Sequence, residues 1–256
     1  MIEEVARAFN RAKKLYDAKR EEDRGQALEA ALAVGKLCLE TLAREAVLDH
    51  YGNFRGSKGP VAYHAATYLD SVSRPYLDGL FTADPATFEA EGQEFAADMV
   101  ARRSNPQLHA RVIYTVMTAF SLCFNLWKPG SRKTPGTFFE VLIGSAAIHR
   151  FPGVTLSKHV KIEDVPVDDV DALVDVDGAE GDAVEALKGD SVATDLVLTR
   201  EAGDRAAVIP LKITTRERIV QPFAHQRILS SAFGDKYASF IACISEVQRD
   251  GVTTSC

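Results

Sequence analysis

Three side chains in the second half of the chain have types and positions suited to metal-dependent hydrolysis. Asp195 begins one apolar, β-branched run, TDLVLTR, and Lys212 lies near the end of the next, AAVIPLKITT. Adjacent antiparallel strands would bring these two side chains to one edge of a sheet. A carboxylate there can hold Mg²⁺, and a neighbouring ammonium can orient the attacking water and offset the charge of a phosphate. Glu140, the single acid of an apolar helical segment, would add a second oxygen ligand.

A charged triplet, Arg216-Glu217-Arg218, follows shortly after the lysine. Arginine can bond bidentately to guanine O6 and N7 in the major groove, and glutamate can accept from cytosine N4, so the triplet is suited to a G/C-rich site. Thr214 and Glu217 also match a capping box, which would fix a helix start whether or not DNA is read there. Ordinary helix-surface charges are the alternative interpretation.

The run DLVLTR...AVIPLKITTRERIVQPFAHQRIL resembles the active-site core of the PD-(D/E)xK nucleases, and specifically type II restriction endonucleases that read CCGG-centred sites. In that group an Arg-acid-Arg reading element follows the catalytic lysine after three residues, as 216–218 follow Lys212 here. The segment SRKTPGTFFEVLIG resembles the helix that bears an accessory metal-site glutamate, which corresponds to Glu140. The resemblance covers residues 131–247 and implies Mg²⁺-dependent hydrolysis of double-stranded DNA at a palindromic site containing CCGG.

Two positions depart from the family pattern. The residue two before the lysine, commonly acidic, is Pro210, which cannot bind a metal. In the CCGG-reading group that acid lies 13 or 14 residues after the lysine, where this chain has His225 and Gln226. Gln226 is the better positional match for a catalytic role, and His225 is read first as a hydrogen-bonded structural histidine; either can contact the metal or its water. A catalytically weakened DNA-binding protein and a structure-specific repair or junction nuclease are therefore the alternatives.

Helical patterns dominate the N-terminal half of the chain. Residues 2–48 predict two helices separated by Asp23-Arg24-Gly25, and the Gly- and Pro-rich stretch 51–85 predicts packed loops and short helices. Asp84-Pro85 and Asn105-Pro106 each predict a helix start, the second helix running to about Trp127.

The pattern changes after Lys128-Pro129-Gly130. An apolar helix follows Thr134, and β-branched runs at 194–200, 206–215 and 237–247 enclose a helical segment that Gly234 closes. The fold class is therefore α/β, or α+β in stricter use, with a mixed central sheet flanked by helices. We expect residues 1–127 to be a helical region for dimerisation or DNA contacts, and 128–256 to be the catalytic core with an acidic insertion at 163–190.

The net charge of −6 is unevenly distributed. Residues 163–190 hold eleven acids and one lysine, so this segment carries −10 and the rest of the chain +4. A modestly basic body is compatible with a phosphate-lined cleft. Arg132 and Lys133 form a small basic loop that suits phosphate contacts, and an ordinary solvated loop explains it equally well.

Cysteine usage and hydropathy favour a reduced, cytoplasmic protein. The four cysteines form neither a CxxC pair nor a zinc-ligand cluster, and the charged start MIEEVARAFNRAKK lacks the apolar run of a signal peptide. The most apolar stretch, Val112 to Trp127, is shorter than the ~18 residues of a spanning helix, so we expect a core helix and no membrane. A palindromic target also favours a homodimer or higher homo-oligomer.

Overall fold

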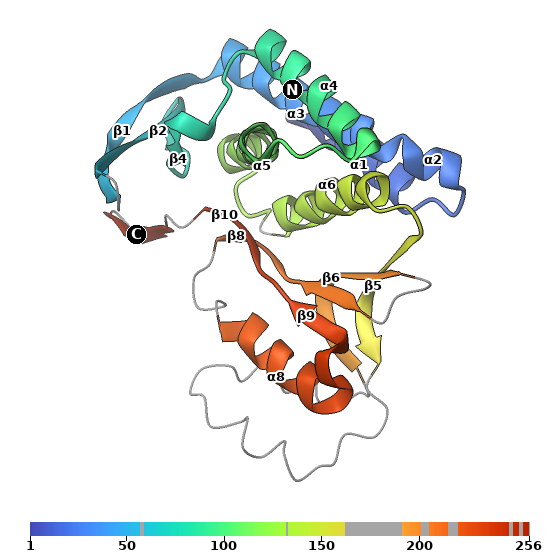
Figure 1. Cartoon of the computed structure of the whole chain (residues 1–256). Helices are drawn as coiled ribbons and strands as arrows, with labels where there is room; N and C mark the ends of the chain where they lie inside the picture. Colours follow the sequence, from blue (N-terminus) through green and yellow to red (C-terminus); the bar gives the residue numbers. More distant parts are fainter. Residues whose placement is uncertain are drawn as a thin grey trace. The chain divides into compact units, whose positions relative to one another are not determined.

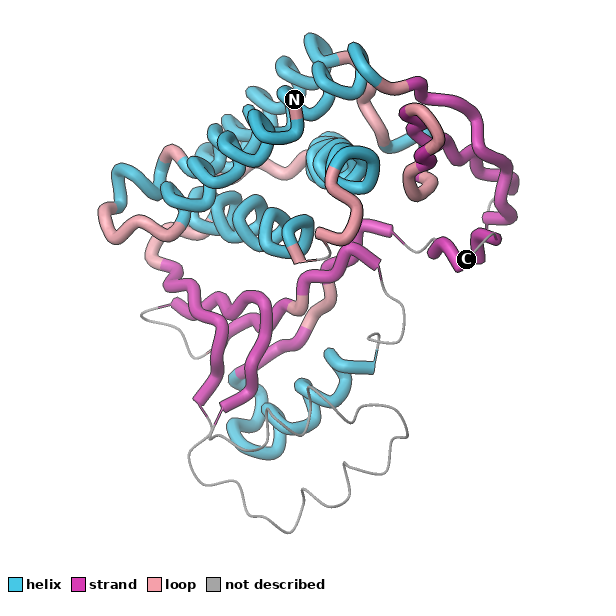
Figure 2. The backbone as a smooth tube through the Cα atoms, turned by 180° about the vertical axis from the view of Figure 1, so that it is seen from behind, coloured by secondary structure: helices cyan, strands magenta, loops and turns pink. Residues whose placement is uncertain are grey.

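The computed structural model describes residues 1–56, 59–131, 133–161, 191–200, 205–214, 220–245, 248–250 and 253–255. The chain divides into two compact units, one formed by Met1–Pro152 with Ile244–Cys256 and the other by Gly153–Cys243. Helices dominate the first unit, and a mixed sheet forms the second (Figures 1 and 2). The predicted α+β class with a helical N-terminal region is confirmed, and the acidic insertion lies outside the described residues.

The first unit is organised around α3 (Ala27–Glu45), which packs against α1 (Ile2–Tyr16), α4 (Pro85–Ala101), α5 (Pro106–Trp127) and α6 (Thr134–Arg150) (Figure 1). Phe9 of α1, Phe120 of α5 and Phe138 of α6 form an aromatic cluster with ring centroids 4.2–5.7 Å apart. The helix break predicted at residues 23–25 is misplaced: the chain leaves α1 at Asp17, and a short α2 (Glu21–Gly25) occupies the predicted break.

Both predicted helix starts after residue 80 are confirmed. The Asp84 carboxylate accepts a hydrogen bond from Thr87 N at 2.7 Å, and Asn105 Oδ1 accepts one from Leu108 N at 3.3 Å. These side chains satisfy amide groups that have no partner within the first helical turn. Among the described residues, α5 alone has the length and hydropathy of a helix that could cross a membrane, and 67% of its apolar window is buried inside the protein. Its buried face confirms the predicted core helix.

The segment predicted as packed loops and short helices is instead a β-hairpin, so that prediction is wrong. Strand β1 (Val47–Gly56) pairs antiparallel with β2 (Gly59–Tyr68), and short strands β3 (Ser71–Val72) and β4 (Tyr76–Leu77) add to β2. Gly52 and Gly59, which had indicated breaks in the chain, lie within the strands of the hairpin. The pairing register shifts between His50 and Gly52, and Gly59, the first residue of β2, has a φ of +123°. Bulges and positive φ angles favour glycine.

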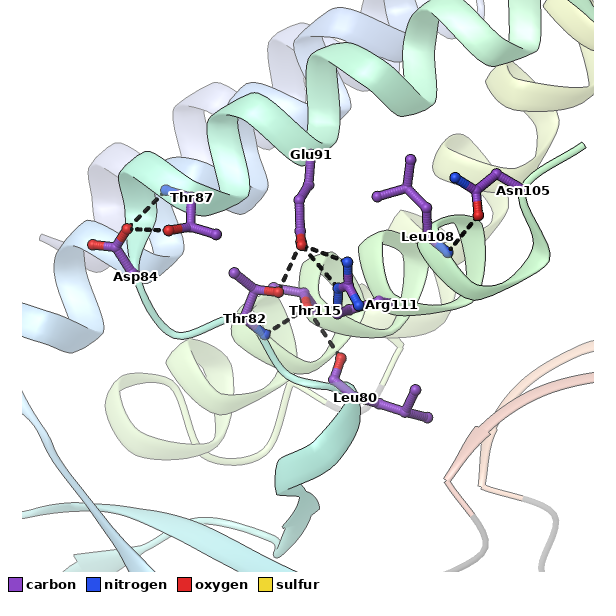
Figure 3. A network of polar contacts seen from close by, with 9 residues as sticks. All are labelled: Leu80, Thr82, Asp84, Thr87, Glu91, Asn105, Leu108, Arg111 and Thr115. Atoms are coloured by element: carbon purple, nitrogen blue, oxygen red, sulfur yellow. Dashed lines mark hydrogen bonds and ion pairs between the residues drawn. The ribbon is translucent and has the colours of Figure 1, made fainter. Parts of the chain in front are cut away.

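A polar network fixes the chain between the hairpin and α4 to the helices (Figure 3). Glu91 of α4 accepts from Arg111 Nε of α5 at 2.9 Å and from Thr82 Oγ1 at 2.8 Å. Thr115 of α5 accepts from Thr82 N at 3.0 Å and donates to the carbonyl of Leu80, in the 3₁₀ turn η1 (Asp78–Leu80), at 3.3 Å. Because α5 satisfies two of its backbone groups and α4 binds the Thr82 hydroxyl, this connection has a defined path.

The second unit is a mixed sheet. Strands β5 (Val154–Lys161), β6 (Ser191–Arg200), β7 (Ala206–Ile209) and β9 (Tyr237–Ser239) lie in that order, antiparallel except for the parallel pair β7–β9. Strand β8 (Leu211–Thr214) pairs with β10 (Ala242–Ser245). Strands β11 (Gln248–Asp250) and β12 (Thr253–Ser255) pair with each other in the C-terminal segment, which belongs to the first unit. The predicted strands are confirmed, although two of them are interrupted, and β5 is an addition that the sequence analysis did not expect.

Helix α8 (Gln221–Phe233) covers the sheet of the second unit (Figures 1 and 2). Its Leu229 is fully buried among Val160, Val192, Val197 and Val208 of the strands. The helix ends at Gly234, whose φ of +60° is a conformation that glycine adopts without strain, and η5 (Gly234–Lys236) leads into β9. The predicted closure of this helix by Gly234 is confirmed.

The close approach of α3 to its neighbours generates a test of the first unit. A Cβ on Gly35 would lie 2.9 Å from Val116 Cγ2, so we expect Gly35→Ala to lower the free energy of unfolding by about 1–3 kcal/mol. A Cβ on Gly92 would meet nothing closer than Leu32 at 3.9 Å, so Gly92→Ala should instead raise stability by up to ~1 kcal/mol through helix propensity. Urea denaturation followed by circular dichroism measures the free energy of unfolding of both variants. Equal changes in the two variants would contradict the close packing of Gly35 against Val116.

Candidate active site

A break in one strand creates the site. Leu196 pairs with Ile209, so the antiparallel register of β6 and β7 sets Asp195 level with Pro210. Proline has no N–H to give to the ladder, and the strand is interrupted there. The amide of the next residue, Leu211, donates instead to Asp195 Oδ2 at 2.8 Å. The hydrogen bond from Leu211 N to Asp195 thus takes the place of the ladder bond that Pro210 cannot donate, and it holds the Asp195 carboxylate in position.

Lys212 completes an ion pair with the same carboxylate oxygen. Its Nζ lies 2.8 Å from Asp195 Oδ2, and the two side chains are 14% and 37% exposed. A charge-assisted bond of this length in a partly buried setting orients both groups. Asp195 Oδ1 accepts no hydrogen bond from the part of the chain that the structure describes. The predicted meeting of Asp195 and Lys212 is confirmed.

His225 lies within electrostatic range of Asp195 and Lys212. It is 7% exposed, and both Lys212 and Asp195 act on its charge. Burial first, and then the Lys212 ammonium, lower the pKa of His225 below its ordinary value of 6.5, while Asp195 opposes this shift. Its Nδ1 is buried and has no hydrogen-bond partner among the described residues. The structure therefore shows no hydrogen bond at Nδ1 from the described residues, and the interpretation of His225 as a hydrogen-bonded structural histidine stays a prediction.

Gln226, the next residue of α8, has a different set of contacts. Its Oε1 accepts from Ser239 N at 2.6 Å, and its Nε2 donates to Tyr237 O at 3.1 Å and to Ser230 Oγ at 2.8 Å. The amide thereby ties α8 to β9 through backbone groups of that strand. The contacts favour His225, and not Gln226, as the α8 residue that faces Asp195 and Lys212, and a catalytic role of Gln226 stays a prediction.

Glu140 lies half-buried on α6, next to Tyr16 at the end of α1. Burial, followed by the nearby Glu140 carboxylate, raises the pKa of Tyr16 to about 12. A Cβ on Gly144, one turn after Glu140, would meet the Tyr16 hydroxyl, so this face of α6 packs against α1. Glu140 belongs to the first unit and Asp195 to the second, so their sharing of one cation stays a prediction.

Most of the predicted DNA contacts fall outside the described residues. These are the reading triplet Arg216, Glu217 and Arg218, together with Arg132 of the basic loop. Lys133 is exposed immediately before α6, a position open to a phosphate. The loop and the triplet remain predictions from the sequence.

The donor chemistry fits a divalent cation that keeps part of its water shell. No group of three or more His, Cys, Asp or Glu side chains that could hold a metal gathers among the described residues. Mg²⁺ is commonly bound through one or two carboxylates, with water and substrate phosphates completing its octahedron. Asp195, with its available oxygen beside a lysine, satisfies that requirement.

The comparisons with known proteins identify a close structural relative. The crystal structure of the Type IIP restriction endonuclease Kpn2I superposes with a TM-score of 0.73 and 33% sequence identity, over 97% of this chain and 77% of that one. A scan of protein-family models and a search of curated proteins found no match. The likeness extends over both units, including the helical part that the sequence resemblance did not cover.

The contacts of Gln226 predict a structural effect. We expect Gln226→Ala to lower the free energy of unfolding by about 1–3 kcal/mol, because Ser239 N and Tyr237 O lose their partner. Arg227→Ala, at the exposed neighbouring position, should change it by no more than ~0.5 kcal/mol. Urea titration measures both variants. Unchanged stability in Gln226→Ala together with lost DNA cleavage would instead establish the catalytic role predicted from the sequence.

Proposed function

This chain belongs to the type II restriction endonucleases, and from that premise we propose that it is a Mg²⁺-dependent enzyme that cuts double-stranded DNA at a palindromic, CCGG-containing site. The observation that carries the proposal is the pairing of Lys212 Nζ with Asp195 Oδ2 at 2.8 Å. It joins an ammonium and a carboxylate, the two groups that metal-assisted phosphodiester hydrolysis requires, at the interrupted strand β7–β8.

In this mechanism Asp195, with Glu140 as second carboxylate, would hold the cation. Bound Mg²⁺ would supply Lewis-acid stabilisation of the phosphate and a more acidic water. Lys212 is fixed by Asp195, so its ammonium can orient a water for in-line attack and offset negative charge that develops on the phosphate. The low exposure of Lys212 strengthens this effect, because fewer waters screen its charge.

Recognition is assigned to the triplet Arg216, Glu217 and Arg218, with Lys133 and Arg132 on phosphates. The two arginines suit guanine and the glutamate suits cytosine, which together match a G/C core. A two-fold dimer places one such element on each half of a palindrome, so we propose a homodimer or higher homo-oligomer acting in the cytoplasm.

The decisive experiment incubates the purified protein with plasmid DNA and Mg²⁺ and sequences the ends that form. We expect discrete fragments that share a CCGG core. Lys212→Ala should slow cleavage at least about 100-fold, because an electrostatic group directed at the reacting phosphate is lost. Lys236→Ala serves as the matched control, since Lys236 is an exposed lysine of the same unit.

The alternatives give different results in that assay. Intact DNA with a sequence-specific mobility shift would show a binding protein that lacks cleavage activity, an outcome motivated by Pro210 and by the absent carboxylate on α8. Cutting at branched or damaged DNA without a shared sequence would show a repair or junction nuclease. Neither cutting nor binding would reject the proposed function.

A further inference from the structure

We propose that His225 is a direct ligand of the catalytic cation, so that the site combines a carboxylate and an imidazole and binds Mn²⁺ more tightly than Mg²⁺. The proposal rests on the proposed function and adds the identity of the α8 ligand and the metal preference that follows from it.

The packing of α8 determines which of its residues enters the site. Leu229 is fully buried in the core of the second unit, beneath Val197 and Val208. Residues four apart lie on the same face of a helix, so His225 is directed at the sheet one turn before Leu229. Gln226 is held by the backbone of β9. Rotation of α8 to exchange the two side chains would therefore break both the core packing and the bonds to β9.

The His225 ring has a buried nitrogen atom that a ligand would satisfy. Buried polar atoms are nearly always hydrogen-bonded, and leaving one without a partner costs about 1–3 kcal/mol. Nδ1 of His225 is buried without a partner among the described residues, and the Asp195 carboxylate, whose Oδ1 accepts no bond from those residues, lies within electrostatic range of the ring. A cation between the two would use the lone pair of the ring and the free Asp195 oxygen, and it would remove the cost of the unpaired nitrogen.

The donor set decides the metal preference. Mg²⁺ prefers oxygen ligands in a near-ideal octahedron, whereas imidazole suits the transition metals. Exchanging a carboxylate for an imidazole on α8 therefore lowers the negative charge of the site and shifts its affinity from Mg²⁺ toward Mn²⁺.

The test detects the bond itself by pulsed electron paramagnetic resonance. Protein labelled with ¹⁵N-histidine is frozen with Mn²⁺ and a duplex containing CCGG. We expect a ¹⁵N hyperfine coupling that is absent in His225→Asn and retained in His159→Asn, an exposed histidine of β5 in the same unit. Calorimetric titration should show Mn²⁺ affinity at least about tenfold lower in His225→Asn. In His225→Glu the ratio of Mg²⁺ to Mn²⁺ affinity should rise, with circular dichroism verifying the fold.

The outcomes separate this inference from the proposed function. Mn²⁺ that binds, is lost in Asp195→Ala, and shows no histidine coupling would overturn the role of His225 and leave the nuclease proposal standing. A wild-type complex with DNA that binds no Mn²⁺ would overturn both. A coupling that disappears only in His225→Asn, with the change of metal preference in His225→Glu, would establish the mixed-ligand site.

Discussion

The site depends on one oxygen atom, Asp195 Oδ2, which accepts hydrogen bonds from the Leu211 amide and the Lys212 ammonium at 2.8 Å each. The first bond exists because Pro210 interrupts the ladder between β6 and β7 and directs the following amide to a side chain. The second places a positive charge beside the carboxylate. Pro210, which stands where the family pattern commonly has an acid, thus contributes to the geometry of Asp195.

The elements around this atom supply rigidity. The β6–β7 register fixes the position of Asp195 along the sheet. Val208 O and Pro210 O accept hydrogen bonds from the amides of Phe240 and Ala242, and these bonds keep both parts of the interrupted strand beside the neighbouring segment. Helix α8 is held by Leu229 in the core and by Gln226 on β9. Side chains on such constrained elements lose little entropy when a ligand binds, because most of it is lost during folding.

Sequence alone predicted the parts of this arrangement that local chemistry determines. Runs of β-branched residues located β6, β7 and β8, helix signals located α4, α5 and α8, and alternating strands brought Asp195 to Lys212. The β1–β2 hairpin was missed because Gly52 and Gly59 have the same local signature in a bulge, a turn or an irregular loop. Choosing between His225 and Gln226 required long-range facts, namely the depth of Leu229 and the backbone of β9, which no spacing rule contains.

The double anchoring of α8 also bears on how such enzymes diversify. Among the described residues, the contacts that orient the helix come from the sheet and from β9. The triplet proposed to read the bases lies between β8 and α8 in the sequence and is not one of these contacts. Substitutions there can change the target sequence while the geometry of the cutting centre persists. New specificities are then accessible by short mutational paths that do not pass through an inactive intermediate.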